Sequence, residues 1–234
     1  MKKILMVVTS NDKMGDADYK TGLYLSELTH PYDVFKEAGF AIDVASPKGG
    51  IAPIDTHSLS EFDGNPYEDI TNNTLKLNHV SMNDYDAIFL VGGHGVMWDF
   101  PDNQTLQNLV KEAYHTGKAV AAVCHGPAGL VNVTDTAGNY LFKGKKMTSF
   151  TAAEEATVNL TTIVPFLLEE KFKQNEVLFE HSDVWQEHVV VDGQLITGQN
   201  PASAAGVGRA VVKCLSDSDI NLGSIPSSQV SQNV

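Results

Sequence analysis

Apolar runs of strand length alternate with segments of helix-like spacing along most of the chain. The expected strands cover 4–9, 41–45, 87–91 and 119–123, and the longer expected helices cover 31–38, 103–116 and 201–215. Nearly every position in these strands is apolar, which is typical of a parallel sheet buried on both faces. The pattern therefore predicts an α/β fold, with a mostly parallel central sheet and helices on both faces.

Helix-capping and turn residues mark the ends of several elements. We expect Pro31 to open the first long helix, and Asn103 or Asp102 to cap the second. Asp192 and Gly193 lie between apolar runs at 189–191 and 195–197, and the Asp-Gly pair favours a tight hairpin turn. The chain therefore ends its sheet with a hairpin before the last helix.

The remaining segments are shorter or less regular. We expect a strand at 146–150, a helix from about 152, a helix at 166–172 and an extended segment at 176–179. Residues 46–85 are rich in Gly, Pro, Asn and Asp, with one short helix expected, and their length indicates an insertion or a lid. We expect one domain over 1–222 and a polar C-terminal tail over 223–234.

Composition and charge remove several functional classes. The 234-residue chain carries a formal net charge of −13, which argues against non-specific binding to nucleic acid and against docking on anionic membranes. The short apolar run in MKKILMVVTSND suits a first strand rather than a signal peptide, and no stretch approaches the ~18 apolar residues that span a membrane. Two cysteines, Cys124 and Cys214, fall in different expected elements and indicate reduced thiols in the cytoplasm.

Cys124 is the leading candidate for chemistry. It ends the apolar run at 119–123, and Gly126 and Pro127 after it fit a sharp turn into a helix. This is the layout of a nucleophile elbow at the carboxyl edge of the sheet, where ligands of such folds bind. We expect the helix N-terminus to lower the thiol pKa. The alternative is a buried strand cysteine that acts as a small hydrophobic residue.

Other residues can complete a site around this thiol. Backbone N–H groups of the glycine turn at 92–95 and of His125 can form an oxyanion hole, and the His125 side chain can act as a general base or stabilise a thiolate. Alternatively, the turn binds no ligand, and a backbone carbonyl holds His125. Glu27 lies in an apolar stretch and can relay a proton if buried, whereas Glu154 and Glu155 open a helix and can simply compensate its dipole. No HExxH, CxxC or H-x-H spacing occurs, so no metal is expected.

Together these residues resemble the ThiJ/PfpI superfamily, in its branch of heat-shock-type chaperones and glutathione-independent glyoxalase III enzymes. The similarity covers roughly 2–215, and its matching segments are KTGLYLSELTHPY at 20–32, GGHG at 92–95, AVCHGPA at 122–128, SFTAAEE at 149–155 and TGQNPAS at 197–203. The resemblance implies a flavodoxin-like α/β sandwich (a fold related to class I glutamine amidotransferases) and a homodimer.

The resemblance also implies roles for individual residues. Cys124 matches the nucleophile, His125 its partner, Glu155 the third member of the triad and Glu27 a glutamate that hydrogen-bonds the sulfur. Gly93, with its neighbour Gly92, and His125 match the oxyanion donors. The implied reaction converts methylglyoxal or a related 2-oxoaldehyde to a lactate-type 2-hydroxy acid without a cofactor. Three alternatives stay open: a holdase chaperone for unfolded client proteins that senses oxidants, a cysteine peptidase or amidase, and a protein deglycase.

Overall fold

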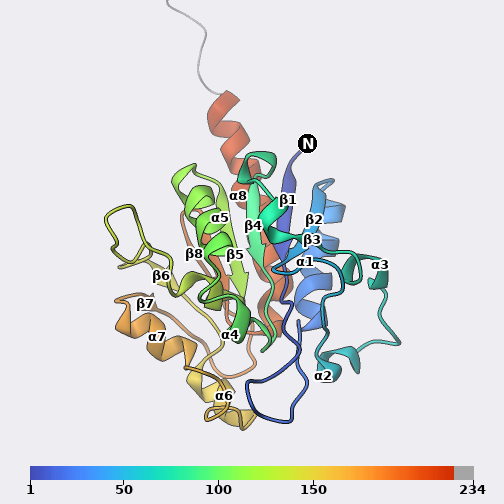
Figure 1. The fold of residues 1–234 in the computed structure, drawn as a ribbon. Helices are drawn as coiled ribbons and strands as arrows, with labels where there is room; N and C mark the ends of the chain where they lie inside the picture. The colour runs from blue at the N-terminus through green and yellow to red at the C-terminus, as the bar shows by residue number, and fades with distance from the viewer. Residues whose placement is uncertain (224–234) are drawn as a thin grey trace, which may run out of the picture.

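A seven-stranded sheet runs through the middle of the computed structural model, with the strand order β3-β2-β1-β4-β5-β9-β8 (Figure 1). Every neighbouring pair is parallel except the antiparallel hairpin of β8 and β9. The strands are β1 (Lys3–Val7), β2 (Ala41–Ser46), β3 (Leu75–Lys76), β4 (Ala87–Leu90), β5 (Ala119–Val123), β8 (Val189–Asp192) and β9 (Leu195–Gly198). The predicted fold class, a mostly parallel α/β sandwich, is confirmed.

The structure describes the backbone of residues 1–223 and the side chains of residues 1–217. Gly223 is the last residue of the final helix, so the rest of the expected polar tail, 224–234, lies outside the described residues. Within the described part of the chain, no helix is both long and apolar enough to cross a membrane.

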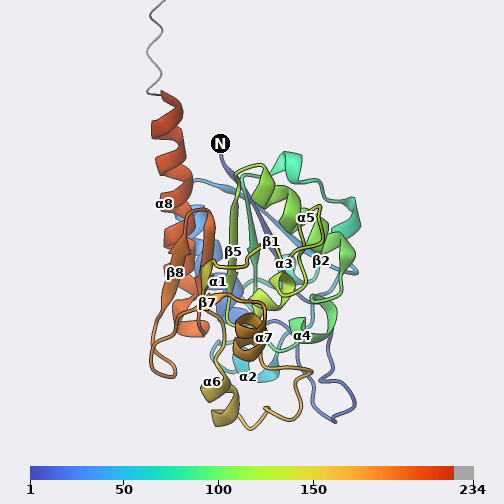
Figure 2. The same ribbon diagram turned by 90° about the vertical axis from the view of Figure 1, so that its left-hand side faces the viewer.

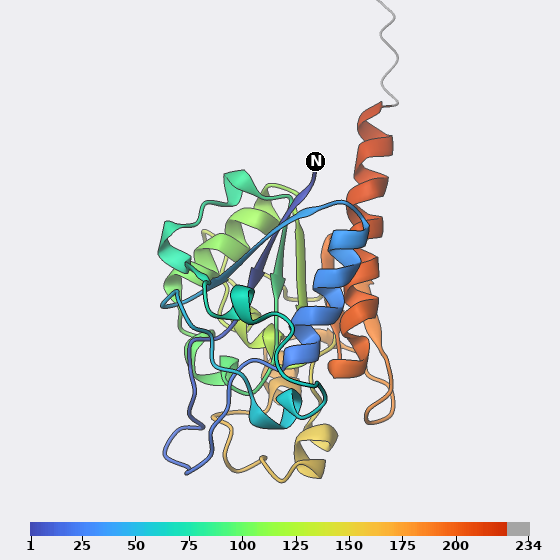
Figure 3. The ribbon, with the colours of Figure 1, turned by 90° about the vertical axis from the view of Figure 1, so that its right-hand side faces the viewer.

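Helices cover both faces of the sheet (Figures 2 and 3). On one face α1 (Leu25–Glu37) packs against α8 (Ala204–Gly223), and on the other face lies α5 (Gln104–His115). Each face has its own buried apolar cluster. The shorter helices are α2 (Thr56–Leu59), α3 (Glu68–Thr71), α4 (Val96–Asp99), α6 (Ala152–Thr157) and α7 (Leu168–Gln174), with 3-10 turns η1 (Leu77–His79), η2 (Met82–Asp84), η3 (Gly126–Leu130) and η4 (Pro201–Ser203).

Several expected ends agree with the structure. The side chain of Asn103 accepts a hydrogen bond from the Leu106 N–H, so Asn103 caps α5 as predicted. Gly193 has a φ of +63° in the turn between β8 and β9, which is the backbone conformation that the Asp-Gly signal predicts. These ends are local features of the backbone, which explains why the sequence reveals them.

Three expectations were wrong in their bounds. Helix α1 begins at Leu25, and Pro31 lies inside it, because burial of Leu25 and Leu28 in the apolar cluster extends the helix toward its N-terminus. The expected strand at 146–150 is only β6 (Lys146–Met147), which pairs with β7 (Leu178–Phe179) in a separate two-stranded sheet. The last helix continues past residue 215 to Gly223.

Residues 46–85 contain more structure than the sequence predicts. They hold two short helices, α2 and α3, rather than one, and they supply β3 at the edge of the main sheet. Four-residue helices are too short to give a hydrophobic period, which is why the pattern missed one of them. That the segment acts as a lid or an insertion stays a prediction.

The carboxyl ends of the parallel strands meet at one edge of the sheet, which is the lower edge in Figure 1. Helices α2, α4 and α6 gather around this edge. Open parallel sheets bind ligands beyond this edge.

Candidate active site

Cys124 follows the last residue of β5 in a strained backbone conformation. Its φ is +58°, a left-handed conformation that costs a non-glycine residue about 1–2 kcal/mol. Two hydrogen bonds hold it there: its N–H donates to the Gly198 carbonyl, and its own carbonyl accepts from the Phe150 N–H, each at 2.9 Å. The turn into η3 needs a glycine, since a Cβ on Gly126 would lie 2.2 Å from the Leu90 carbonyl oxygen. The backbone therefore has the geometry of a nucleophile elbow.

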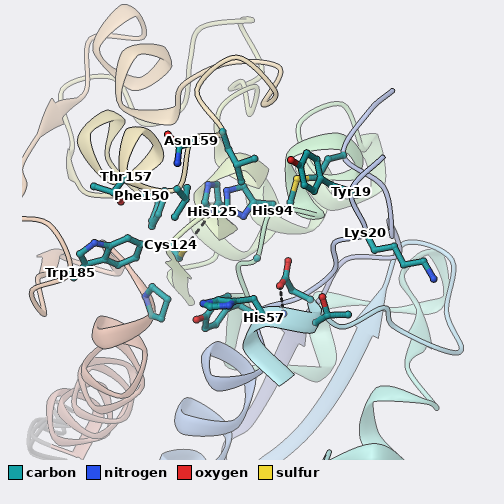
Figure 4. A pocket seen from close by; sticks show the side chains of 18 residues that line it. Tyr19, Lys20, His57, His94, Cys124, His125, Phe150, Thr157, Asn159 and Trp185 are labelled. Atoms are coloured by element: carbon teal, nitrogen blue, oxygen red, sulfur yellow. Dashed lines mark hydrogen bonds between the residues drawn. The ribbon is translucent and has the colours of Figure 1, made fainter. Parts of the chain in front are cut away.

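The structure brings Cys124, His125 and Glu155 into one chain of contacts, and Figure 4 shows the first two of these residues. The Cys124 Sγ lies 3.3 Å from His125 Nδ1, and His125 Nε2 lies 2.8 Å from Glu155 Oε2. Both side chains beyond the sulfur are buried, with 1% of His125 and 5% of Glu155 exposed. This is the order of nucleophile, base and orienting carboxylate that acyl-transfer triads use.

A second histidine, His94, shares the same carboxylate. Its Nε2 lies 2.8 Å from Glu155 Oε1, and the centroid of its ring lies 4.0 Å from that of His125. The sequence pattern pointed to the glycines of the 92–95 turn but not to the histidine between them. Its place between two glycines at the end of a predicted strand was the one available signal.

Electrostatics fix the protonation states around Glu155. Burial alone would favour the neutral acid, but His125 and His94 hold the pKa of the Glu155 carboxyl well below its usual range. Burial and the neighbouring His94 lower the pKa of His125, against the opposing effect of Glu155. At neutral pH His125 is therefore uncharged. With its Nε2–H donating to the Glu155 carboxylate, its Nδ1 is free to accept the proton of the Cys124 thiol.

Glu27 lies on α1, fully buried, beside the sulfur. Burial raises the pKa of its carboxyl well above the ordinary value, although contacts with the Cys124 thiol and the Gly92 N–H act in the opposite direction. Neither oxygen forms a hydrogen bond of regular geometry in the structure. Burial therefore favours the protonated form of Glu27, whose proton is available to a group that binds beside it.

The thiol differs from the prediction in one respect. Burial raises the pKa of Cys124 well above its ordinary value, so the expected lowering by a helix N-terminus was wrong. The physical reason is that only 3% of Cys124 is exposed, and burial disfavours the charged thiolate. The resting group is a thiol, and His125 must remove its proton as the sulfur attacks.

The glycine turn lies against the nucleophile as expected. A Cβ on Gly92 would lie 2.2 Å from Glu27 Oε2 and 2.9 Å from the His125 backbone nitrogen. Gly93 faces the cavity with a φ of +102°. Gly92, Gly93 and the His125 N–H therefore lie together beside the sulfur, and their role as oxyanion donors stays a prediction.

The two adjacent glutamates of α6 point to different neighbours. Glu154 caps its own helix with Thr151, and its Oε1 accepts from the Trp185 N–H, Gln199 Nε2 and Asn200 Nδ2 at 2.8 to 3.0 Å. Glu155 alone reaches His125. Glu154 therefore ties three segments of the chain together, while Glu155 faces the site.

A cavity of about 740 Å³ opens in front of the sulfur (Figure 4). Its lining includes Phe150, Trp185, Tyr19, Tyr24, His57 and Leu160. The donor atoms of His94, His125 and Glu155 lie within 4.8 Å of one another, so these three residues, among those that the structure describes, could hold a metal ion. They lie far apart in sequence, so a search for metal-ligand spacing does not find them.

Comparison with known proteins identifies the family. The sequence signature of the DJ-1/PfpI family matches residues 19–214. The chain belongs to the DJ-1/PfpI family. Glyoxalase 3 of Candida albicans is 32% identical over 230 residues, which cover 91% of this chain and 98% of the relative. The glutathione-independent glyoxalase HSP31 of Saccharomyces cerevisiae is 33% identical and covers 87% and 93%.

Relatives of this DJ-1/PfpI protein whose structures have been solved share its fold. The Rapid Encystment Protein of 24 kDa from Francisella tularensis superimposes with a TM-score of 0.89 at 39% identity, covering 92% of this chain and 99% of the other. Glyoxalase III from Candida albicans gives a TM-score of 0.82 at 30% identity, covering 91% and 97%. The predicted family and its glyoxalase III branch are thus confirmed.

Proposed function

We propose that the protein is a glutathione-independent glyoxalase that converts methylglyoxal and related 2-oxoaldehydes to 2-hydroxy acids. The observation that carries the proposal is the relay from Cys124 through His125 to Glu155, with the buried carboxyl of Glu27 also beside the sulfur. The relatives that align with this chain over nearly their whole length are named as glyoxalases. The reaction needs a nucleophile, a proton relay and an oxyanion site, and residues for each lie at one edge of the sheet.

The first step forms a carbon–sulfur bond. The sulfur of Cys124 attacks the aldehyde carbon C1, the thiol proton passes to His125 Nδ1, and Glu155 stabilises the imidazolium that results. In this proposal, backbone N–H groups at Gly93 and His125 stabilise the oxygen that gains charge. Protonation of that oxygen gives a hemithioacetal and returns His125 to its neutral form.

The second step is an isomerisation. A base removes the proton from C1 and the resulting enediol is protonated at C2, so that the hemithioacetal becomes a thioester of the same composition. His125 and Glu27 are the groups beside the sulfur that can remove and deliver this proton. Water then cleaves the thioester to the 2-hydroxy acid and the free thiol. The sum is one aldehyde plus one water, and no electron donor or acceptor is required.

The burial and pKa of the Cys124 thiol distinguish the proposed enzyme from an oxidation sensor. A cysteine that senses oxidants is ordinarily exposed and of low pKa, whereas Cys124 is buried with a raised pKa. This supports the enzyme over the oxidation sensor. Holdase activity toward client proteins, peptidase, amidase or deglycase activity, a homodimer and a cytoplasmic location stay predictions.

The decisive experiment is an assay of methylglyoxal consumption and lactate formation without glutathione. Wild type should turn over the substrate, and Cys124→Ala should reduce turnover to background while folding normally, since Cys124 is small and alanine leaves its packing largely intact. Lactate formation by Cys124→Ala at the wild-type rate would contradict the cysteine mechanism. Suppression of client aggregation that survives Cys124→Ala would establish a separate chaperone function.

A further inference from the structure

The cavity beside Cys124 is much larger than the aldehyde that it is proposed to bind. Its volume of about 740 Å³ lies within the ~300–1,000 Å³ of pockets that enclose drug-sized ligands. Methylglyoxal has only three carbons, and two of them must lie at the sulfur to react. The walls of the cavity can therefore recognise a much larger substituent than a methyl group.

An aromatic wall leads from the nucleophile to the rim of this cavity (Figure 4). The ring of Phe150 lies 4.4 Å from that of His125, centroid to centroid, and the ring of Trp185 lies 5.6 Å from that of Phe150 at an interplanar angle of 62°. The Phe150 N–H also donates to the Cys124 carbonyl. The wall is therefore fixed to the backbone of the reacting residue.

Trp185 is held in an unfavourable conformation at the rim. Its φ is +62°, although large side chains rarely adopt the left-handed region, and 44% of the residue is exposed to solvent. The backbone N–H of Trp185 donates to the buried carboxylate of Glu154. The same carboxylate binds Gln199 and Asn200, so several contacts hold the loop around Trp185 in this conformation. Backbone strain that the surrounding structure maintains is typical of ligand-binding positions.

We propose that Phe150 and Trp185 form an aromatic subsite for the substituent on C2, so that the enzyme prefers aryl 2-oxoaldehydes of the phenylglyoxal type to methylglyoxal. This inference rests on the proposed glyoxalase function. With C1 bonded to the sulfur, the C2 substituent can extend along Phe150 toward Trp185. An aryl ring there gains offset or edge-to-face contacts that a methyl group cannot make.

The test compares kcat/KM for phenylglyoxal and methylglyoxal in wild type, Trp185→Ala and Trp185→Phe. Wild type should favour phenylglyoxal. Trp185→Ala should lower kcat/KM for phenylglyoxal by about tenfold and that for methylglyoxal by less than about twofold, because aromatic contact is lost only for the aryl substrate. Trp185→Phe should keep most of the preference. Val191→Ala, an exposed apolar residue on β8, is the matched control and should change neither value.

Phenylglyoxal also modifies arginine, which the design must separate from turnover. The chain has one arginine, Arg209, and its guanidinium binds Glu187 close to the Trp185 loop. Repeating the comparison in an Arg209→Lys background removes this side reaction. The ratio of the two kcat/KM values should stay the same in that background, and disappearance of the preference there would overturn the inference.

A binding measurement keeps the inference testable if Trp185→Ala does not fold. The chain has two tryptophans, so Trp98→Phe leaves Trp185 as the reporter. Mandelate, the product of phenylglyoxal, should quench its fluorescence at lower concentration than lactate does. Three results would each overturn the subsite while leaving the glyoxalase function intact. They are equal quenching by both acids, an equal loss of kcat/KM for both aldehydes in Trp185→Ala, and a wild-type preference for methylglyoxal. Failure of wild type to use either aldehyde would overturn the function itself.

Discussion

Replacing Glu155 with glutamine removes one negative charge from the site and keeps the size of the side chain. In the wild type each carboxylate oxygen faces one imidazole, with His125 at Oε2 and His94 at Oε1, both at 2.8 Å. Glutamine offers one acceptor oxygen and one NH₂ group. One of the two imidazoles must therefore lose its N–H acceptor, and His125 loses its counter-ion in either case.

The magnitude follows from the contact between Glu155 and His125. When His125 takes the thiol proton it becomes a cation whose Nε2 lies 2.8 Å from Glu155 Oε2. Unit charges with centres about 4 Å apart attract by about 4 kcal/mol at an effective dielectric constant of about 20. Since about 1.4 kcal/mol corresponds to a factor of ten, Glu155→Gln should lower kcat on the order of a thousandfold.

The assay is kcat for methylglyoxal, measured with the pH dependence of kcat/KM. Glu155 raises the pKa of His125, so its removal lowers that pKa further, and the acidic limb of the profile should move to lower pH. Glu154→Gln is the matched control, one residue away on the same helix. Because Glu154 binds Thr151, Gln199 and Asn200, this variant should lose stability. The acidic limb should move less than in Glu155→Gln, because Glu154 raises the pKa of His125 less than Glu155 does.

Two outcomes would refute the reasoning. The first is a folded Glu155→Gln protein whose kcat stays within about threefold of the wild type, which would mean that no charge develops on His125. The second is an equal loss of kcat in Glu154→Gln at unchanged thermal stability. In that case the effect would arise from helix α6 as a whole rather than from contact with His125.

Two further changes test other parts of the same edge. Gly92→Ala places a Cβ 2.2 Å from Glu27 Oε2 and 2.6 Å from the Val123 carbonyl oxygen. Activity should be lost, and the melting temperature should fall by several degrees, because overpacking costs about 1–3 kcal/mol. Wild-type activity in this variant would show that the Glu27 carboxyl is dispensable. Burial raises the pKa of Asp99 from 3.8 to about 6, although hydrogen bonds from Ser10 and Thr9 act in the opposite direction. Between about pH 4 and 6 the folded state therefore keeps a proton on Asp99 that the unfolded state releases, and the contribution of Asp99 to stability falls as the pH rises. The free energy of unfolding, measured with denaturant, should not show this loss of about 3 kcal/mol at most in Asp99→Asn. If the free energy of unfolding of both proteins changed with pH in parallel, the raised pKa of Asp99 would be contradicted.

Local sequence signals determined the elements that carry the site. The apolar runs before Gly92 and Cys124 specify buried parallel strands, and Gly126 with Pro127 specifies the turn that exposes the thiol to the cavity. These features depend on backbone conformation and on burial of neighbouring residues, both of which residue type restricts directly. The resemblance to relatives then selected Glu27 and Glu155 from 29 acidic residues.

The tertiary structure alone decided which groups share a contact and what charge each carries. Glu154 and Glu155 are adjacent and chemically identical, and only the direction of α6 assigns the first to the Trp185 loop and the second to His125. His94 joins the carboxylate because β4 and β5 are neighbours in the sheet, which no spacing along the chain reveals. The sequence favoured a lowered pKa at Cys124, whereas burial beside Glu27 raises it. Burial and the approach of distant side chains set a pKa, and both arise only when the chain has folded.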